Sequence, residues 1–321
     1  MNPIIEISDL HVRFKGERNV HALNGVDISL QQGEVLGLLG ESGSGKSVTL
    51  RALLRMLPPR RTDISGRITV GGEDVMTMPA DALESLRGGV VSMVFQEPML
   101  ALDPVYTIGE QIAESVVKHE KVSFAAGRKR ALEMLERVRI PSPARRLDAY
   151  PHEMSGGMRQ RAMIALALAC KPKVLLADEP TTALDATVQI QILLLLRELQ
   201  RELGMAVIFV THDIGVAVEI SDRVAVMYAG RIVESGSLRE VVKTPAHPYT
   251  RGLLSSTMRG AQRGHKLEAI PGSPPRLDSV PTGCAFLPRC SHVSGACSVE
   301  PLPLTQTGAG HLVRCVNTGS I

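Results

Sequence analysis

Tryptophan is missing from this sequence of 321 residues, and the other aromatic residues are few: four tyrosines and five phenylalanines. Proteins that bind single-stranded nucleic acid without sequence preference stack bases on aromatic side chains, so this scarcity argues against such a surface. The excess of basic over acidic residues is also small, with a formal net charge of +3. A charge this close to zero does not by itself indicate a nucleic-acid partner.

Long apolar runs are absent as well. No stretch of about 18 apolar residues, the length that a membrane-spanning helix needs, occurs in the sequence. The opening residues, MNPIIEISDL, carry acidic side chains and lack a basic region followed by an apolar run, so we expect no secretory signal. If the protein acts at a membrane, we therefore expect it to do so as a peripheral protein.

The patterns that are present alternate between strands and helices. Short β-branched segments at 4–14, 20–30 and 66–75 predict antiparallel strands near the N-terminus. Later apolar runs at 35–39, 90–95, 173–177 and 206–211 predict buried strands, each followed by a helical pattern. Strands that alternate with helices are typical of an α/β fold with a mainly parallel sheet. Residues 224–236 predict a closing hairpin that turns at Ala229 and Gly230.

Two regions depart from that alternation. Residues from about 97 to 165 are mostly helical and predict a helical insertion into the core. After residue 243 proline, glycine and serine become dense and periodicity fades, which predicts a separate, irregular module at 244–321. We therefore expect one domain at 1–243 and a small C-terminal module.

The segment GESGSGKS at residues 40–47 matches the pattern G-x-x-x-x-G-K-[ST] of a phosphate-binding loop. Glycines let backbone N–H groups curl around phosphates, and the helix that follows points its positive end at them. Lys46 adds a cation, and the hydroxyl of Ser47 can ligate Mg²⁺. The segment lies between a predicted strand and a predicted helix, which is the context that this motif requires.

A second candidate lies at the end of the strand KVLLADEP. Asp178 is suited to hold Mg²⁺, and Glu179 is suited to polarise an attacking water as a general base. An apolar run that ends in two carboxylates is weak evidence alone. It becomes strong when it follows a phosphate-binding loop.

Here the sequence resembles a family. The segment MSGGM at 154–158, followed by Arg159, Gln160 and Arg161, is similar to the signature motif of ABC ATPases. Gln96 resembles the family's glutamine loop, Ala183, Leu184 and Asp185 its D-loop, and His212 its switch histidine. The resemblance covers about residues 4–240 and implies a P-loop NTPase (RecA-like) core with an N-terminal antiparallel β subdomain. The signature departs from its commonest form by Met154 for Leu, which conserves volume, and by Met158 for Gln, which removes an amide.

The resemblance implies a mechanism in which two such domains meet head to tail with ATP between them. Ser155, Gly156 and Gly157 of one subunit would face the γ-phosphate bound by the other. Phe14 is a candidate for stacking on adenine, with a plain core position as the alternative. The residues expected to bind ATP are Phe14, Gly40, Ser42, Gly43, Ser44, Gly45, Lys46, Ser47, Val48, Ser155, Gly156, Gly157 and Asp185. Those expected to act in catalysis are Glu179, His212 and Gln96, with Ser47, Gln96 and Asp178 holding Mg²⁺.

The C-terminal module indicates which group of ABC ATPases the sequence resembles. The segment AHPYTR at 246–251, followed by GLLSS, is similar to an extension found in ATPase subunits of oligopeptide and dipeptide importers. Such a subunit would act at the cytoplasmic face of the inner or plasma membrane, with transmembrane permease subunits, a second ATPase subunit (identical or related) and, indirectly, a solute-binding protein. Peptides, nickel chelates and opines are all within the range of solutes that the resemblance implies.

Four of the five cysteines gather in this module, at Cys284, Cys290, Cys297 and Cys315. A cytosolic location disfavours disulfides, so clustered cysteines suggest a metal. Some members of the peptide-importer group carry a four-iron cluster here, and the sequence lacks the C-x₂-C pairs typical of zinc. A [4Fe–4S] cluster, a structural Zn²⁺ and reduced thiols remain open.

A different class, an ABC ATPase that acts on nucleic acid or in translation, is the alternative function. Such proteins carry long coiled-coil arms or two ATPase domains in one chain. Here a single motif set is present, and the distance from Lys46 to Ser155 leaves room for only a small helical insertion. We therefore expect an ATPase that energises solute import, with no nucleic-acid partner.

Overall fold

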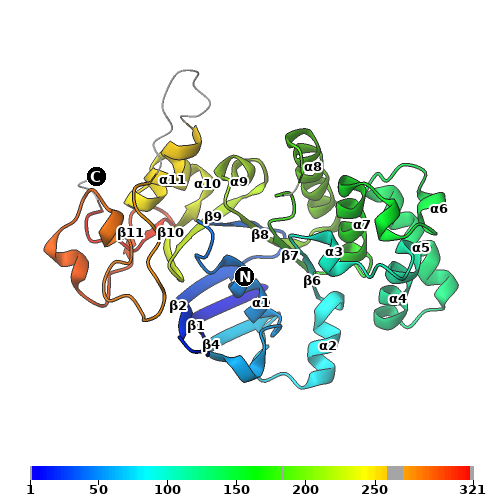
Figure 1. Ribbon diagram of the computed structural model, residues 1–321, viewed down its shortest axis with the longest axis horizontal. Coiled ribbons are helices and arrows are strands. Elements are labelled where there is room, and N and C mark those ends of the chain that lie inside the picture. The colour runs from blue at the N-terminus through cyan, green and yellow to red at the C-terminus, as the bar shows by residue number, and fades with distance from the viewer. Residues whose placement is uncertain (1, 183, 259–269, 319–321) are drawn as a thin grey trace. The chain divides into compact units, whose positions relative to one another are not determined.

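The computed structural model describes residues 2–182, 184–258 and 270–318 (Figure 1). By compactness the chain divides into two units. Unit 1 contains Met1–Met76 and Phe209–Ile321, and unit 2 contains Thr77–Ile208. Segments from both ends of the sequence thus belong to one unit. The C-terminal module contacts the N-terminal strands there, and the N–H of His21 donates a hydrogen bond to the carbonyl oxygen of Leu277. The expected division at residue 243 stays a prediction.

Unit 1 begins with a four-stranded antiparallel sheet. Its strands are β1 (Ile5–Phe14), β2 (Val20–Leu30), β4 (Thr62–Val70) and β5 (Glu73–Asp74), in the spatial order β2-β1-β4-β5. Apolar and polar residues alternate along β1 until a register shift between Ile7 and Leu10, after which Leu10 and Val12 are again buried. The predicted N-terminal antiparallel strands are confirmed.

A second set of strands in unit 1 joins the early and late parts of the chain. They are β3 (Val35–Leu39), β9 (Arg223–Tyr228), β10 (Arg231–Ser237), β11 (Thr305–Gln306) and β12 (Leu312–Val313), in the order β11-β12-β10-β9-β3. β3 is parallel to β9, and all five of its residues are buried, as a run of apolar residues covered on both faces requires. β9 and β10 form the predicted hairpin, with Ala229 and Gly230 both at positive φ in the turn.

The helices of unit 1 lie between strands in chain order, and the α-helices among them are labelled in Figure 1. They are α1 (Lys46–Leu53), η1 (Pro59–Arg61), α9 (Ile214–Ile220), α10 (Leu238–Lys243), α11 (Pro248–Met258), η4 (Leu287–Arg289) and η5 (Gly295–Ser298). The C-terminal module is less irregular than its composition predicts. It contains the 11-residue helix α11, and its strand β12 pairs with β10.

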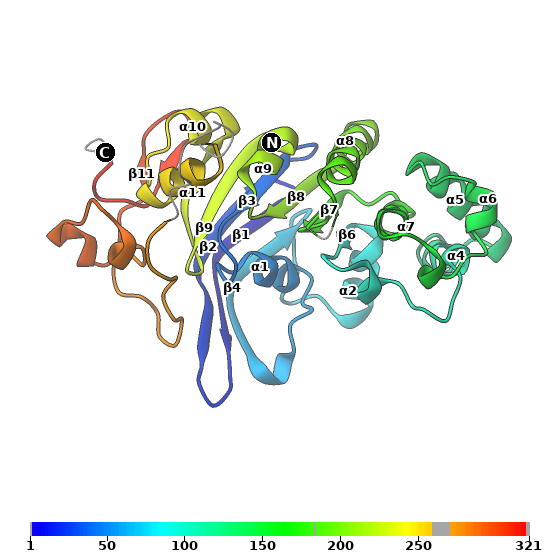
Figure 2. The ribbon, with the colours of Figure 1, turned by 45° about the horizontal axis from the view of Figure 1, so that its top comes forward.

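Unit 2 combines two parallel strands with the helical insertion (Figure 2). Its elements are α2 (Ala80–Gly89), β6 (Val91–Val94), α3 (Pro98–Ala101), α4 (Ile108–Glu120), α5 (Phe124–Arg137), α6 (Pro143–Arg146), η2 (Pro151–Glu153), α7 (Gly156–Leu168), β7 (Val174–Asp178) and α8 (Ala186–Leu203). α4, α5 and α7 pack against one another and confirm the predicted insertion. Thr107 starts α4 with a capping box, in which its hydroxyl accepts from the N–H of Glu110 and the Glu110 carboxylate accepts from the N–H of Thr107.

The remaining strand, β8 (Ala206–Thr211), contains the point at which the two units divide, and all six of its residues are buried. Parallel strands, an antiparallel β subdomain and a helical insertion are therefore all present, and the predicted α/β fold class is confirmed. Within the described part of the chain, no helix combines the length and apolar character that crossing a membrane requires.

Candidate functional site

The loop at residues 40–47 connects the end of β3 to the start of α1, as its motif predicts. Two of its glycines are required by close contacts. A Cβ atom at Gly40 would lie 2.2 Å from the carbonyl oxygen of Met227, and Gly40 has a φ of 152°. Gly45, at the N-cap of α1 with a φ of 109°, would place a Cβ atom 2.7 Å from a methyl group of Leu23. Any side chain at these two positions would force the loop out of its curled path.

Lys46 folds back over this loop. Its side chain is almost fully buried, and Nζ donates hydrogen bonds to the carbonyl oxygens of Gly40 (2.7 Å) and Glu41 (2.9 Å). A cation held beside a curled loop at a helix N-terminus is suited to bind an anion. Ser47 and Val48 form the first turn of α1 with Lys46, whereas Ser42 and Gly43 are exposed at the tip of the loop.

Two other predicted site residues lie in unit 1. Phe14 is the last residue of β1, half-buried and paired with Val20 and Thr62. His212 is exposed and directly follows β8. The next residue, Asp213, caps α9 and accepts a hydrogen bond from the N–H of Gly215 at 2.7 Å. His212 thus stands between a buried strand and a capped helix, where both neighbours restrain its backbone.

Three predicted residues lie at one edge of the parallel strands of unit 2. Asp178 ends β7 and is 3% exposed. Glu179 follows it, with its backbone at a φ of 46° and its carboxylate accepting a hydrogen bond from the Thr182 hydroxyl at 2.9 Å. Val94, the last residue of β6, pairs with Ala177, so Gln96 leaves the same edge two residues later. The parallel register thus brings Gln96 and the two carboxylate residues to the same edge of these strands.

The signature segment is the N-terminus of α7. Ser155 is its N-cap, and the hydroxyl oxygen accepts a hydrogen bond from the N–H of Met158 at 3.3 Å. Ser155 and Gly156 are exposed, which leaves the positive helix end accessible to an anion from outside the subunit. Met154 is buried, consistent with a volume-conserving replacement of leucine. Met158 keeps its contact through the backbone, and that contact needs no amide side chain.

The D-loop residues precede α8. Asp185 is exposed and caps this helix by accepting a hydrogen bond from the N–H of Val188 at 3.0 Å. Leu184 is half-buried, and Ala183 lies outside the described residues.

The four cysteines of the C-terminal module are free thiols in one neighbourhood of unit 1. Burial and the three neighbouring thiols raise the pKa of Cys284 to about 11. Cys290 and Cys297 accept hydrogen bonds from the N–H groups of His292 and Ser294. Across residues 2–182, 184–258 and 270–318, however, no three His, Cys, Asp or Glu side chains form a group that could hold a metal ion. The proximity of the thiols is as expected, but a metal centre is not supported by their geometry.

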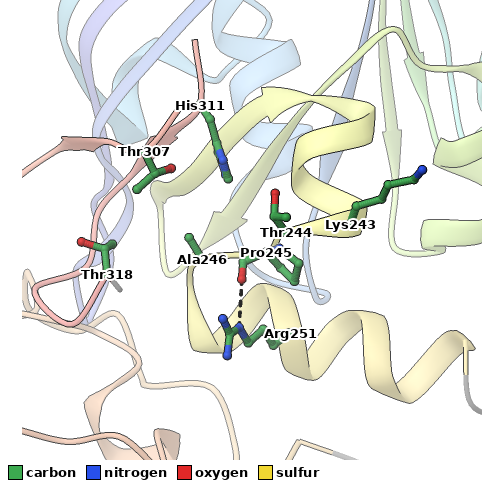
Figure 3. Close-up of a pocket in the computed structure, with 8 residues that line it drawn as sticks. All are labelled: Lys243, Thr244, Pro245, Ala246, Arg251, Thr307, His311 and Thr318. Atoms are coloured by element: carbon green, nitrogen blue, oxygen red, sulfur yellow. Dashed lines mark hydrogen bonds between the residues drawn. The ribbon is translucent and has the colours of Figure 1, made fainter. Parts of the chain in front are cut away.

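Residues of α10 and of the C-terminal module line an open pocket of about 680 Å³ (Figure 3). Arg251 lies on its wall and donates a hydrogen bond to the carbonyl oxygen of Pro245 at 2.9 Å. Lys243 and His311 also line it, but the His311 ring bonds to a buried carboxylate. This cavity contains none of the residues expected to bind ATP.

Comparison with known proteins places this site in a family. A model of the family "ABC transporter" matches residues 23–182, which include the phosphate loop and the Asp178–Glu179 strand end. A second model, "Oligopeptide/dipeptide transporter, C-terminal region", matches residues 233–297.

Proteins similar over nearly the whole chain include a putative peptide import ATP-binding protein of Brucella melitensis, 49% identical over 98% of this chain and 97% of the relative. A probable peptide ABC transporter ATP-binding protein of Sinorhizobium fredii is 46% identical, over 99% and 96% of the two chains. A solved dimeric ATP-binding cassette, MJ0796, in a post-hydrolysis state bound to ADP and Pi, is 32% identical and covers 73% of this chain and 99% of its own, with a TM-score of 0.66. The structure of cbiO1 from Clostridium perfringens, part of an ABC transporter complex, has a TM-score of 0.65 at 31% identity and covers 76% of this chain and 92% of its own.

The chain therefore belongs to the ABC transporter family of ATP-binding proteins, and it is an ATPase. Within that family it carries the C-terminal region of the oligopeptide/dipeptide transporters. The predicted family is confirmed.

Proposed function

We propose that this protein hydrolyses ATP to drive the import of di- or oligopeptides, or related solutes, through permease subunits in a membrane. The observation that carries this proposal is the match of residues 233–297 to the oligopeptide/dipeptide transporter C-terminal region, directly behind a complete ATPase motif set. Relatives that align over almost the whole chain are named as a putative peptide import ATP-binding protein and a probable peptide ABC transporter ATP-binding protein.

Within the nucleotide site we assign the roles residue by residue. The phosphate loop, Lys46 and the N-terminus of α1 bind the phosphates, and Phe14 stacks on adenine. The hydroxyl of Ser47, the carboxylate of Asp178 and the amide oxygen of Gln96 are hard oxygen donors of the kind that Mg²⁺ prefers, and the ion would neutralise charge on the phosphates. Glu179 polarises the attacking water, and His212 contacts the γ-phosphate.

We assign the opposite wall of the site to a second ATPase subunit. Ser155 and Gly156 are exposed at the N-terminus of α7, and this is the surface that a γ-phosphate held by the partner would meet. Asp185 would lie at the same seam. The solved relative MJ0796 is dimeric, which supports this arrangement.

A permease would dock on the segment that follows Gln96 in the sequence. Four large apolar side chains are exposed there, around α3 and the start of α4: Met99 (44%), Leu100 (75%), Val105 (69%) and Tyr106 (54%). A group of exposed apolar side chains of this kind indicates a protein interface. Its position next to Gln96 would link the state of the nucleotide to the permease and place the chain at the cytoplasmic face of the membrane.

The four cysteines remain a hypothesis for metal binding. Four free thiols in one neighbourhood are the donors that an iron–sulfur cluster or Zn²⁺ takes. Their described positions do not form a metal-binding group, so no step of the proposed mechanism uses a metal there.

The test is to purify the chain with candidate permease subunits and a solute-binding protein, in lipid vesicles, and to measure ATP hydrolysis. We expect the rate to rise when permease and peptide-loaded binding protein are present, and to stay level when DNA or RNA is added. Stimulation by nucleic acid and none by the transport components would overturn the proposal in favour of the alternative class.

A further inference from the structure

One residue of the phosphate loop, Glu41, is bonded to the C-terminal module. The guanidinium of Arg289 donates to both carboxylate oxygens of Glu41, at 2.7 and 3.0 Å. The Arg289 side chain is 4% exposed and that of Glu41 is 27% exposed. A paired, two-bond contact from a nearly buried guanidinium is a strong and directional interaction.

The backbone of Glu41 is held as well. Its N–H donates to the hydroxyl oxygen of Tyr249 at 2.8 Å, and its carbonyl oxygen accepts from Lys46 Nζ. The side chain, the N–H and the carbonyl group of Glu41 are thus all bonded. Because the residues that follow Glu41 form the curled part of the loop, this fixes the point from which their N–H groups turn toward a phosphate.

The two residues that hold Glu41 are themselves immobilised by packing. Tyr249 is fully buried, and the centre of its ring lies 4.5 Å from the ring centre of Tyr228 and 5.4 Å from that of Phe286. The guanidinium of Arg289 lies 5.8 Å from the centres of the Tyr228 and Phe286 rings and also donates to the carbonyl oxygen of Pro271. Tyr249 belongs to the AHPYTR segment and Arg289 directly precedes Cys290, so two separate parts of the module meet at the loop.

The charges explain why such support is needed. A carboxylate within a loop that binds a triphosphate repels that ligand. The hydrogen bonds to Glu41 raise the pKa of Arg289, which therefore keeps its charge and neutralises this carboxylate. Burial raises the pKa of Tyr249 well above its ordinary value, so its hydroxyl adds no negative charge.

We propose that Arg289 and Tyr249 are positioning residues for ATP binding: they hold Glu41 so that the phosphate loop has its binding shape, and its carboxylate is neutralised, before nucleotide arrives. The C-terminal module thereby sets the affinity of the site for ATP as well as carrying the importer-specific region. This inference rests on the proposed nucleotide-binding role of residues 40–47.

The test compares Arg289→Gln and Tyr249→Phe with the unchanged full-length chain. We expect Arg289→Gln to raise the Kd for MgATP and the KM about tenfold, a size common for the loss of a contacting charged pair, while kcat changes less than twofold. Tyr249→Phe, which removes one hydroxyl, should raise the Kd about threefold. Thermal unfolding measured on the same samples separates loss of affinity from loss of fold.

A double variant gives the sharpest readout. If Arg289 acts by neutralising Glu41, then Glu41→Gln combined with Arg289→Gln should bind ATP more tightly than Arg289→Gln alone, because no unpaired carboxylate remains. A purely structural role of Arg289 gives no such recovery, and equal affinities would overturn the electrostatic part of the proposal. Should Arg289→Gln not fold, Arg289→Lys, which keeps the charge but loses the paired contact, tests the positioning part alone: we expect it to raise the Kd for MgATP, and an unchanged Kd would overturn that part.

The matched control is Glu300→Gln. Glu300 also lies in the C-terminal module and pairs at 2.8 Å with Arg231 of β10, but it does not contact the phosphate loop. We expect the Kd of this variant for MgATP to stay within twofold of the value for the unchanged chain. A tenfold loss in this control, or an unchanged Kd in a folded Arg289→Gln protein, would overturn the proposal. Lys46→Ala tests the nucleotide site separately, since retained ATP affinity there would refute the site itself.

Discussion

Nε2 of His311 lies 2.7 Å from a carboxylate oxygen of Glu234, and both side chains are buried. The same carboxylate accepts hydrogen bonds from the N–H groups of Ala246 and His247, at 2.8 and 2.9 Å. Glu234 belongs to β10 and is fully buried, while its partners come from the AHPYTR segment and from the residue before β12. One carboxylate therefore connects the closing hairpin to two distant parts of the C-terminal module.

This arrangement makes Glu234 a test of the module's stability. In Glu234→Gln one side-chain oxygen is replaced by an NH₂ group that cannot accept, so a buried donor loses its partner. We expect a loss of about 1–3 kcal/mol in the free energy of unfolding, measured by denaturant titration. Glu219→Gln, at an exposed position of α9, is the control and should stay within about 0.5 kcal/mol. If the free energy of unfolding of Glu234→Gln is unchanged, these hydrogen bonds do not contribute to stability.

Glu179→Gln tests the assignment of the general base. The substitution keeps the size of the side chain and an oxygen for the Thr182 hydroxyl but removes the basic carboxylate. We expect ATP to bind while hydrolysis slows at least about 100-fold, in a single-turnover assay. Glu136→Gln, at an exposed position of α5, controls for loss of a carboxylate in the same unit. Near-normal turnover in Glu179→Gln would exclude it from this role.

The exposed apolar side chains that follow Gln96 in the sequence predict which variants uncouple hydrolysis from transport. Leu100→Ser and Tyr106→Ser should weaken binding to the permease about tenfold, the effect typical of truncating a central interface residue. Hydrolysis by the isolated chain should not change, because neither residue is assigned to the nucleotide site. Phe124→Ser is the control, since Phe124 is similarly exposed (51%) at the start of α5. A permease that binds all three variants equally would place the docking surface elsewhere.

His247 predicts a component of acid sensitivity. Burial lowers its pKa from 6.5 to about 3, and its Nδ1 accepts a hydrogen bond from the N–H of Tyr249. Between these two values the unfolded chain takes up a proton that the folded chain does not, so stability falls as the pH falls from 6.5 toward 3. At pH 5 the loss from this residue is about 2 kcal/mol.

The variant His247→Asn keeps a hydrogen-bond acceptor but cannot titrate. We expect its stability to fall less than that of the unchanged chain between pH 7.5 and pH 5, by about 2 kcal/mol, in urea unfolding curves. His152→Asn, at an exposed histidine, controls for the loss of an imidazole. Parallel pH profiles for His247→Asn and the unchanged protein would contradict the prediction.

Metal analysis decides the hypothesis for the cysteines. If the thiols hold an iron–sulfur cluster, anaerobically purified protein contains iron and sulfide and absorbs visible light, and Cys290→Ser loses that absorbance. Cys170→Ser is the control, because Cys170 lies in unit 2, outside the group of four. Zinc without iron would support the alternative metal, and a chain free of both would leave four reduced thiols.

The sequence by itself determined the parts whose physical causes are local. Glycines at 40, 43 and 45, followed by Lys46, predict a curled loop wherever a strand precedes and a helix follows, and the structure has that loop. Asp178 and Glu179 end a run of apolar residues, so their place at a strand end follows from the pattern. The hairpin turn at Ala229 and Gly230 was predictable because two adjacent strands need a short connection.

Only the tertiary structure decided how the C-terminal module contacts the phosphate loop. Glu41 and Arg289 lie 248 positions apart, and no periodicity or spacing links them. Helix α11 has a weak pattern, and its position depends on packing Tyr249 against Tyr228 and Phe286 rather than on local propensity. Contacts between distant segments are selected by the shape and charge of surfaces that exist only after folding, so the attachment of this module to the phosphate loop became visible only in three dimensions.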